Sequence, residues 1–170
     1  MPFAPAIRRA APLALAAVLI APALAPAAPS TACRGTATSW AQAARSLSFP
    51  VFRPSQLAGL RQVRLVRPDA SCAGASLDAR FVRPDGAALR IVQGIPRSTG
   101  AAGDAPLVSR PRVGARRASL FAYGPRHDPH RVLVLSIATA DGEVGLIAER
   151  ISARDLIAIA RGLRAVRGPA

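Results

Sequence analysis

The sequence predicts an α+β fold, in which an antiparallel sheet of about six strands carries a C-terminal helix on one face and a short N-terminal helix. Between residues 60 and 148, short apolar runs alternate with Gly, Pro and Asp residues that favour turns. Residues 39–47 and the segment after residue 152 instead have apolar residues at the helical spacings of three and four. Strands followed by a helix favour a sheet that the helix covers.

The N-terminal segment has the pattern of a cleavable export signal. Arg8 and Arg9 precede an apolar run, Leu13–Leu24, that is shorter than the roughly 20 residues needed to span a membrane. Cleavage after Ala27 satisfies the preference of signal peptidase for small residues. We therefore expect an extracytoplasmic protein, secreted or periplasmic, with three parts: a signal peptide (1–27), a tail (28–37) and a single domain (38–166).

The two cysteines, Cys33 and Cys72, are both expected outside the cytoplasm. An even pair in an oxidising compartment most often forms a disulfide, and a loop of about 40 residues would restrict the unfolded chain by ~4 kcal/mol. The alternative is a lipoprotein anchored at Cys33, because a small residue precedes it, although Ser30 stands where lipoprotein signals usually have an aliphatic residue. We expect the disulfide.

The net charge is +14, and all 23 basic residues are arginines. A charge of this size draws an exported protein toward anionic lipid headgroups or an acidic envelope protein. Nucleic acid is the usual partner of so basic a chain, but export and the lack of a basic motif interleaved with aromatics argue against it. We expect no nucleic-acid partner and no cofactor.

The domain is expected to open with a short helix over residues 39–47, with Thr38 or Ser39 as its N-cap. The helical spacing of its apolar residues places Trp40 toward the core. Residues 48–54 should be extended, because each proline biases the residue before it away from helix.

Six runs predict strands. They span residues 60–66, 77–82, 88–93, 118–123, 132–137 and 144–148. The segment Arg83–Gly86 has strong turn chemistry and predicts a hairpin between the second and third runs. The run 132–137 is apolar on both faces, as an interior strand should be. Residues 94–115, rich in Gly, Pro, Ser and Arg, are expected to form a long connection.

The C-terminal helix has the clearest local signal of the domain. Ser152 and Asp155 approximate a capping box, with Asp in place of Glu or Gln. Apolar residues then recur with helical period at Leu156, Ile159 and Leu163. An amphipathic helix packed on one face of the sheet is expected.

Several short motifs are similar to those of a bacterial family of exported proteins. They are Phe49-Pro50-Val51, Pro54–Leu57, Gly59-Leu60, Ser152–Leu156 and Ile159–Leu163. Over residues 38–165 the chain resembles the bacterial domain of unknown function numbered 4367, although Ala58 stands where that family has proline and a Trp before the penultimate strand is absent. The family occurs in exported proteins and in the outer parts of some anti-sigma factors and sporulation proteins. The resemblance implies an exported domain and brings no catalytic residues.

One cluster has residues of the kind that bind metals. His127, Asp128 and His130 are the candidate ligands, since two histidines and a carboxylate in a loop can hold a transition metal. No further Cys, Glu or His nearby completes the set, and a polar turn between strands explains the same residues. We expect no metal.

Alternation along the predicted strands places several arginines on one face of the sheet. Arg64, Arg80 and Arg90 point outward if Val63 and other alternate residues point inward. Arg116 and Arg117 would extend this basic stripe. Such a stripe binds an acidic partner or headgroup through bidentate guanidinium contacts; the alternative is an ordinary solvated face of an arginine-rich protein.

No nucleophile elbow, pair of catalytic carboxylates or phosphate-binding glycine loop is recognisable in the sequence. We therefore expect a non-enzymatic envelope domain that binds or senses an acidic or lipid partner. One alternative is a lipid or lipoprotein carrier with an apolar groove between sheet and helix. A further alternative is a hydrolase of an unrecognised type.

Overall fold

The structure is a computed structural model that describes residues 35–67, 76–95, 102, 104–126, 128 and 130–166. The chain divides into two units, Met1–Thr31 and Ala32–Ala170, and every described residue belongs to the second. The predicted signal peptide and both cysteines, Cys33 and Cys72, lie outside the described residues. Within the described part, no helix is long and apolar enough to cross a membrane.

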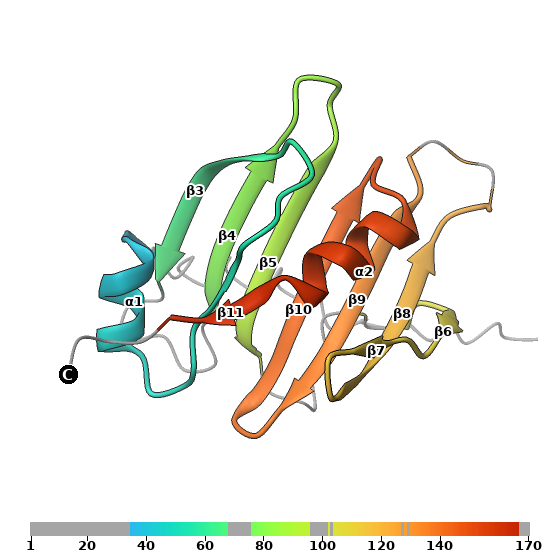
Figure 1. Ribbon diagram of the computed structural model, residues 1–170. Helices are drawn as coiled ribbons and strands as arrows, with labels where there is room; N and C mark the ends of the chain where they lie inside the picture. Colours follow the sequence, from blue (N-terminus) through green and yellow to red (C-terminus); the bar gives the residue numbers. More distant parts are fainter. Residues whose placement is uncertain are drawn as a thin grey trace, which may run out of the picture. The chain divides into compact units, whose positions relative to one another are not determined.

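An antiparallel sheet forms the centre of the described structure (Figure 1). Its nine strands are β1 (Thr36–Ala37), β3 (Arg61–Arg67), β4 (Leu77–Val82), β5 (Ala88–Ile95), β6 (Leu107–Ser109), β7 (Arg112–Val113), β8 (Arg116–Tyr123), β9 (Val132–Thr139) and β10 (Gly142–Glu149). The strand order is β1-β3-β4-β5-β10-β9-β8-β6, and β7 pairs with β8. A separate two-stranded sheet joins β2 (Phe52–Pro54) to β11 (Leu163–Ala165).

The predicted α+β class is confirmed, but the expected number of strands is wrong. The six predicted runs correspond to β3, β4, β5, β8, β9 and β10. Five further strands, β1, β2, β6, β7 and β11, have only two or three residues each, too few for alternation to be visible in the sequence. They form because their backbone groups pair with a neighbouring strand. Part of the expected tail is therefore β1, and the expected 94–115 connection contains β6 and β7.

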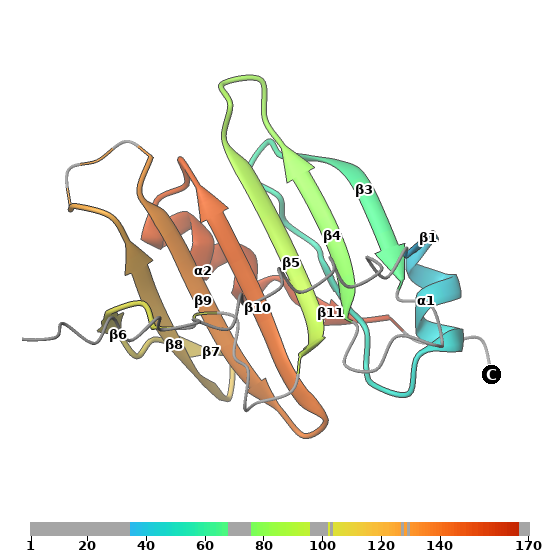
Figure 2. The same ribbon diagram turned by 180° about the vertical axis from the view of Figure 1, so that it is seen from behind.

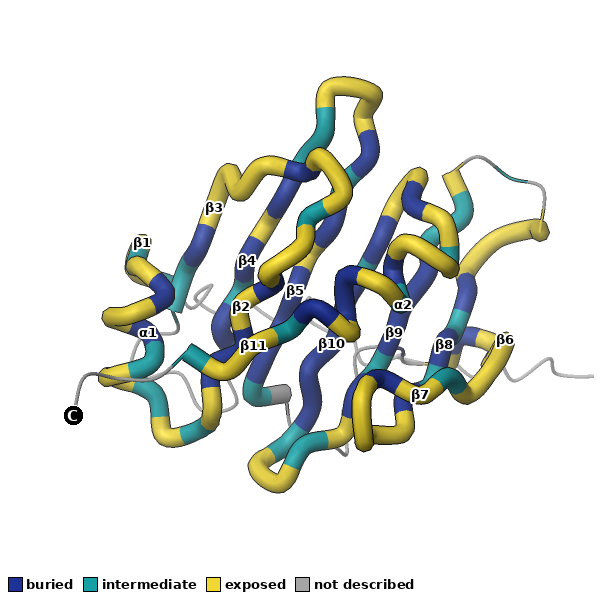
Figure 3. Tube along the Cα trace, in the orientation of Figure 1, coloured by how far each residue is buried: buried dark blue, intermediate teal, exposed yellow. Residues whose placement is uncertain are grey.

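The two helices, α1 (Trp40–Ser46) and α2 (Ala153–Arg161), are both present, but α2 does not cover the sheet alone. It packs against β9 and β10, in front of them in Figure 1 and behind them in Figure 2. β11 and β2 continue the covering layer beside it, and α1 lies near the edge at β3 (Figure 3). The helix also ends earlier than its apolar pattern predicts. Leu163 belongs to β11, because Gly162 ends the helix and the chain turns to pair with β2.

Both predicted helix caps are confirmed. In α1, Gln42 N donates to Ser39 Oγ at 3.2 Å and Ser39 N donates to Gln42 Oε1 at 3.0 Å, which completes a capping box. In α2, Asp155 N donates to Ser152 Oγ at 3.1 Å, and the Ser152 hydroxyl donates to Asp155 Oδ2 at 2.8 Å. Each helix start is therefore determined by residues within one turn of it.

The core lies between the sheet and the layer formed by α2 and β2 (Figure 3). Its fully buried side chains include Phe81 and Leu89 from the sheet and Leu156 and Ile159 from α2. Trp40 is also buried there, as the sequence predicts, and its Nε1 donates to Gln62 Oε1 at 2.7 Å. The opposite side of the sheet carries both exposed arginines, such as Arg80, and the buried apolar residues Val92 and Val134.

A buried glutamine fastens the covering layer to the sheet. Gln93, in β5, has an exposed fraction of 0%. Phe52 N donates to Gln93 Oε1, and Gln93 Nε2 donates to Phe52 O, both at 2.7 Å. The amide side chain thus bonds the β2 backbone as a neighbouring strand would, which satisfies polar groups that burial would otherwise leave unpaired.

Candidate anion-binding site

A tight turn joins β4 to β5 and determines how the two strands align. Arg83 N donates to Ala87 O at 2.9 Å, and Gly86 adopts a φ of +83°, which glycine allows at little cost. The Asp85 carboxylate accepts from Arg83 Nε at 2.9 Å and from Ala87 N at 3.0 Å. These bonds, that from Arg83 first, lower the pKa of Asp85 to about 2. The hairpin predicted from residues 83–86 is confirmed.

The aligned strands bring three of the predicted arginines together. Arg80 lies directly opposite Arg90, and Arg64 lies directly opposite Arg80. A bulge just before Arg64 makes Val63 an extra residue of β3, 56% exposed. The expectation that Val63 points inward is therefore wrong: the extra residue shifts the alternation by one position, and this keeps Arg64 on the same face as Arg80.

We call Arg64, Arg80 and Arg90 the arginine row. All three are exposed. They lie on the face of the sheet away from α2, the outer face, because Ala79 and Phe81 on either side of Arg80 are buried in the core and the other two arginines are in register with Arg80. Figure 2 shows β3, β4 and β5 side by side from this direction. Like charges directly opposite each other on paired strands are unfavourable, so the arginine row does not stabilise the sheet.

Only part of this charge is neutralised by a described residue. Arg90 Nε donates to Asp78 Oδ1 at 3.1 Å and Oδ2 at 3.0 Å, and its Nη2 forms an ion pair with Oδ2 at 2.8 Å. Asp78 reaches Arg90 diagonally, since the residue directly opposite Asp78 is Val92. Among the described residues, Arg64 and Arg80 have no hydrogen-bond or ion-pair partner. Two guanidinium groups are thus available to an acceptor.

The arginine row borders a cavity of about 380 Å³ on the outer face. Its lining residues are Arg64, Asp78, Arg80, Ala88, Leu89, Arg90, Ile147 and Glu149. Three arginines and two carboxylates give the lining a formal charge of +1 at neutral pH. The geometry suits one compact anion, which would lie against Arg64 and Arg80 while Asp78 holds Arg90.

The other two predicted arginines do not join the row. β10 and β9 separate β8, which contains Arg116 and Arg117, from β5. The Arg116 guanidinium lies 4.8 Å from the centre of the Phe52 ring, on the α2 side of the sheet. Adjacent residues of a strand point to opposite faces, so Arg116 and Arg117 could not both have extended one stripe.

The predicted metal cluster is only partly described. His127 lies outside the described residues. The Asp128 carboxylate accepts from His130 N at 2.7 Å, and Arg131 N donates to Asp128 O at 3.0 Å, so Asp128 bonds the backbone of a turn. Among the residues that are described, no group of three or more His, Cys, Asp or Glu side chains could hold a metal ion.

Asp78 and Glu149 also line the cavity, but neither was predicted from the sequence as part of the site. Both are recognisable only from register: Asp78 lies diagonal to Arg90, and Glu149 enters because β10 pairs with β5. Alternation along β4 could have placed Asp78 on the face of Arg80, but no local signal indicates its register with Arg90 or which strand borders β5.

Comparisons of the chain with protein-family models, curated proteins and solved structures give no match. The resemblance to the bacterial domain of unknown function 4367 therefore stays a prediction from the sequence.

Proposed function

We propose that the protein is an extracytoplasmic, non-enzymatic binding domain whose outer face binds a compact anionic group of phosphate or carboxylate chemistry. The observation that carries the proposal is the arginine row, aligned across three strands and bordering a cavity. The location outside the cytoplasm follows from the predicted signal peptide, residues 1–27. A headgroup phosphate and an acidic side chain of an envelope protein are the two sources of such an anion.

Guanidinium chemistry supports this assignment. Each guanidinium offers a planar fork of donors that matches two oxygens of a carboxylate or phosphate. Arg64 and Arg80 lie on adjacent strands in direct register, so one anion can contact both forks. Binding would also relieve the repulsion between these like charges.

A carrier function has less support. It needs an apolar groove between the sheet and α2, but this space is occupied by closely packed side chains. Leu156, Ile159 and Phe81 are each exposed by less than 2%. The outer face is therefore the better-supported site.

The test uses inorganic diphosphate as a soluble probe and isothermal titration calorimetry as the measurement. The double variant Arg64→Gln/Arg80→Gln should lose at least about tenfold in affinity, since each charge-assisted contact contributes on the order of 1.5 kcal/mol. The control Arg110→Gln/Arg126→Gln removes the same charge from exposed positions outside the cavity. Equal losses in both variants would show attraction by net charge alone and overturn the proposal.

A third variant tests the role of Asp78. Asp78→Asn removes a negative charge and releases Arg90, so diphosphate should bind several-fold more tightly. Soluble glycerophosphoglycerol and polyglutamate, titrated in parallel, distinguish a lipid headgroup from an acidic protein as the source of the anion.

A further inference from the structure

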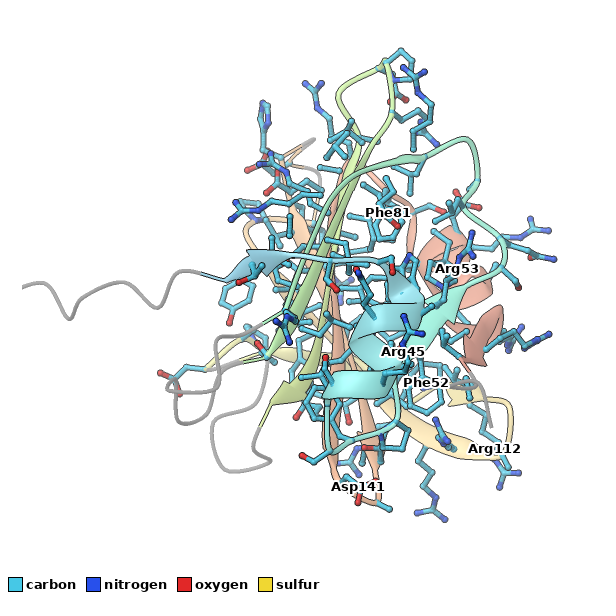
Figure 4. The ribbon with its side chains drawn as sticks, turned by 90° about the vertical axis from the view of Figure 1, so that its left-hand side faces the viewer. Arg45, Phe52, Arg53, Phe81, Arg112 and Asp141 are labelled. Atoms are coloured by element: carbon cyan, nitrogen blue, oxygen red, sulfur yellow. The ribbon has the colours of Figure 1, made fainter. Side chains whose placement is uncertain are left out.

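Five exposed arginines lie, one each, on five elements that contact one another in a closed circuit on the α2 side of the sheet. They come from β2, β7, β8, the end of α2 and β11, and we call them the arginine ring: Arg53, Arg112, Arg116, Arg161 and Arg164. None of them lines the outer-face cavity. Figure 4 shows Arg53 and Arg112 on the side of the molecule where α2 lies.

Contacts link the members of the ring in sequence. Arg53 lies directly opposite Arg164 in the pairing of β2 with β11. Arg164 Nη1 donates to Arg161 O at 3.0 Å and so bonds a terminal carbonyl of α2. Arg161 Nε in turn donates to Arg112 O at 3.4 Å.

The remaining contacts close the circuit. Arg112 lies one residue from Val113, which is directly opposite Arg116 in the pairing of β7 with β8. The Arg116 guanidinium lies over the Phe52 ring at 4.8 Å, and Phe52 is adjacent to Arg53. The five elements therefore contact one another in a circuit, but Arg116 lies on the buried Phe52 side of β2, while Arg53 and Arg164 share the exposed side.

The partners that the described residues provide for the ring are neutral, so none of them neutralises its charge. The acceptors are backbone carbonyls and one aromatic ring. The ion pairs formed among the described residues lie elsewhere, at Arg83 with Asp85 and at Arg90 with Asp78. The direct opposition of Arg53 and Arg164 is unfavourable in isolation. An anionic partner would remove this cost.

We propose that the arginine ring is a second binding surface, separate from the outer-face cavity, and that it docks on an anionic lipid bilayer. A bilayer presents many phosphate groups in a plane, and several exposed cations on one side of a protein bind such a plane together. One compact anion could not contact guanidiniums spread over five elements. The inference goes beyond the outer-face site and does not depend on it.

The chemistry of the ring also predicts how the docking behaves. Among the described residues, the large apolar side chains that are exposed are Val63, Leu107, Val108 and Tyr123, and none belongs to the ring. Without an apolar side chain to insert, attachment is electrostatic and weakens as salt is added.

The test is cosedimentation of the full chain with vesicles of phosphatidylcholine, with or without phosphatidylglycerol. We expect binding only where phosphatidylglycerol is present, with release by salt. The variant Arg53→Gln/Arg161→Gln/Arg164→Gln should bind at least about tenfold more weakly, since each arginine near an anionic membrane strengthens the attraction several-fold. All proteins keep the predicted signal peptide, so any contribution from it is common to every variant.

Matched variants make the result specific to the ring. Arg45→Gln/Arg110→Gln/Arg126→Gln removes the same charge from exposed positions outside both surfaces and should retain binding within about twofold. The cavity variant Arg64→Gln/Arg80→Gln should also retain it, while losing diphosphate. Thermal unfolding confirms that each variant is folded.

Three results would overturn the docking proposal. Equal weakening of the charge-matched control would mean attraction by net charge. Loss of vesicle binding in the cavity variant alone would assign the lipid to the outer face and leave the proposed function standing. Binding of polyglutamate through the ring, without binding of phosphatidylglycerol vesicles, would identify an acidic polymer as the occupant instead of a bilayer.

Discussion

Gln93 and the arginine row place polar groups on opposite faces of the same sheet. The two sets of groups differ in burial and in hydrogen bonding. On the α2 side, Gln93 is completely buried and its amide is bonded at both ends to the Phe52 backbone. On the outer face, Arg64 and Arg80 are exposed, and no described residue pairs with them. Polar groups whose bonds are already made within the fold stabilise it, whereas donors left unpaired at an aligned surface remain available for a ligand.

The same contrast exists between two neighbours in β4. Phe81 is 1% exposed and packs in the core, while Arg80 points to the outer face. Because Phe81 and Arg80 are adjacent in β4, substitutions at these two positions compare the contribution of the two faces to stability at nearly the same place in the sheet.

The largest expected effect comes from Phe81→Ala. The lost burial and the cavity left behind should lower the free energy of unfolding by about 3–5 kcal/mol. Arg80→Gln should change it by less than about 0.5 kcal/mol, because an exposed side chain without a partner is replaced. Urea denaturation monitored by circular dichroism measures both. Similar losses in the two variants would contradict the assignment of the faces.

An intermediate effect is expected for Gln93→Met, which retains most of the side-chain volume. Two backbone groups of Phe52 would lose their partner, and unfolding should become easier by about 2–4 kcal/mol. Gln56→Met, at an exposed position, is the control and should be close to neutral. Under conditions where the Gln93 variant stays folded, diphosphate binding should be unchanged. Unaltered stability would mean that the amide bonds do not fasten β2.

The smallest effect is a pH dependence at the hairpin turn. The pKa of Asp85 is lowered from 3.8 to about 2, so its ionised form stabilises the folded state at neutral pH. This contribution is fully present above the unfolded pKa and is lost as pH falls from about 4 to about 2. The difference in thermal stability between the wild type and Asp85→Asn should therefore shrink over that interval. A difference that stays constant there would refute the lowered pKa.

Those features of the fold that depend on neighbours in the chain were predictable. The caps at Ser39 and Ser152 and the turn at Arg83–Gly86 involve partners at most four residues away. Alternation likewise placed Arg80 and Arg90 on one face, because the side chains of a strand change sides at every residue.

Features that depend on register between distant segments were not predictable. The bulge at Val63 places Gln62 and Arg64 on opposite faces although they are two residues apart, and the pairing of β10 with β5 brings Glu149 into the cavity. The strand order likewise separates Arg117 from the arginine row. No local pattern encodes which strands become neighbours.

By itself, then, the sequence determined the α+β class, the helix caps, the six longer strands and the sidedness of Arg80 and Arg90, because each follows from short-range periodicity and capping chemistry. Only the tertiary structure decided that Gln93 bonds Phe52, that Arg64 aligns with Arg80, and that five elements, each with an exposed arginine, contact one another beside α2. These relations arise from long-range pairing and packing, in which each contact depends on the whole sheet being assembled.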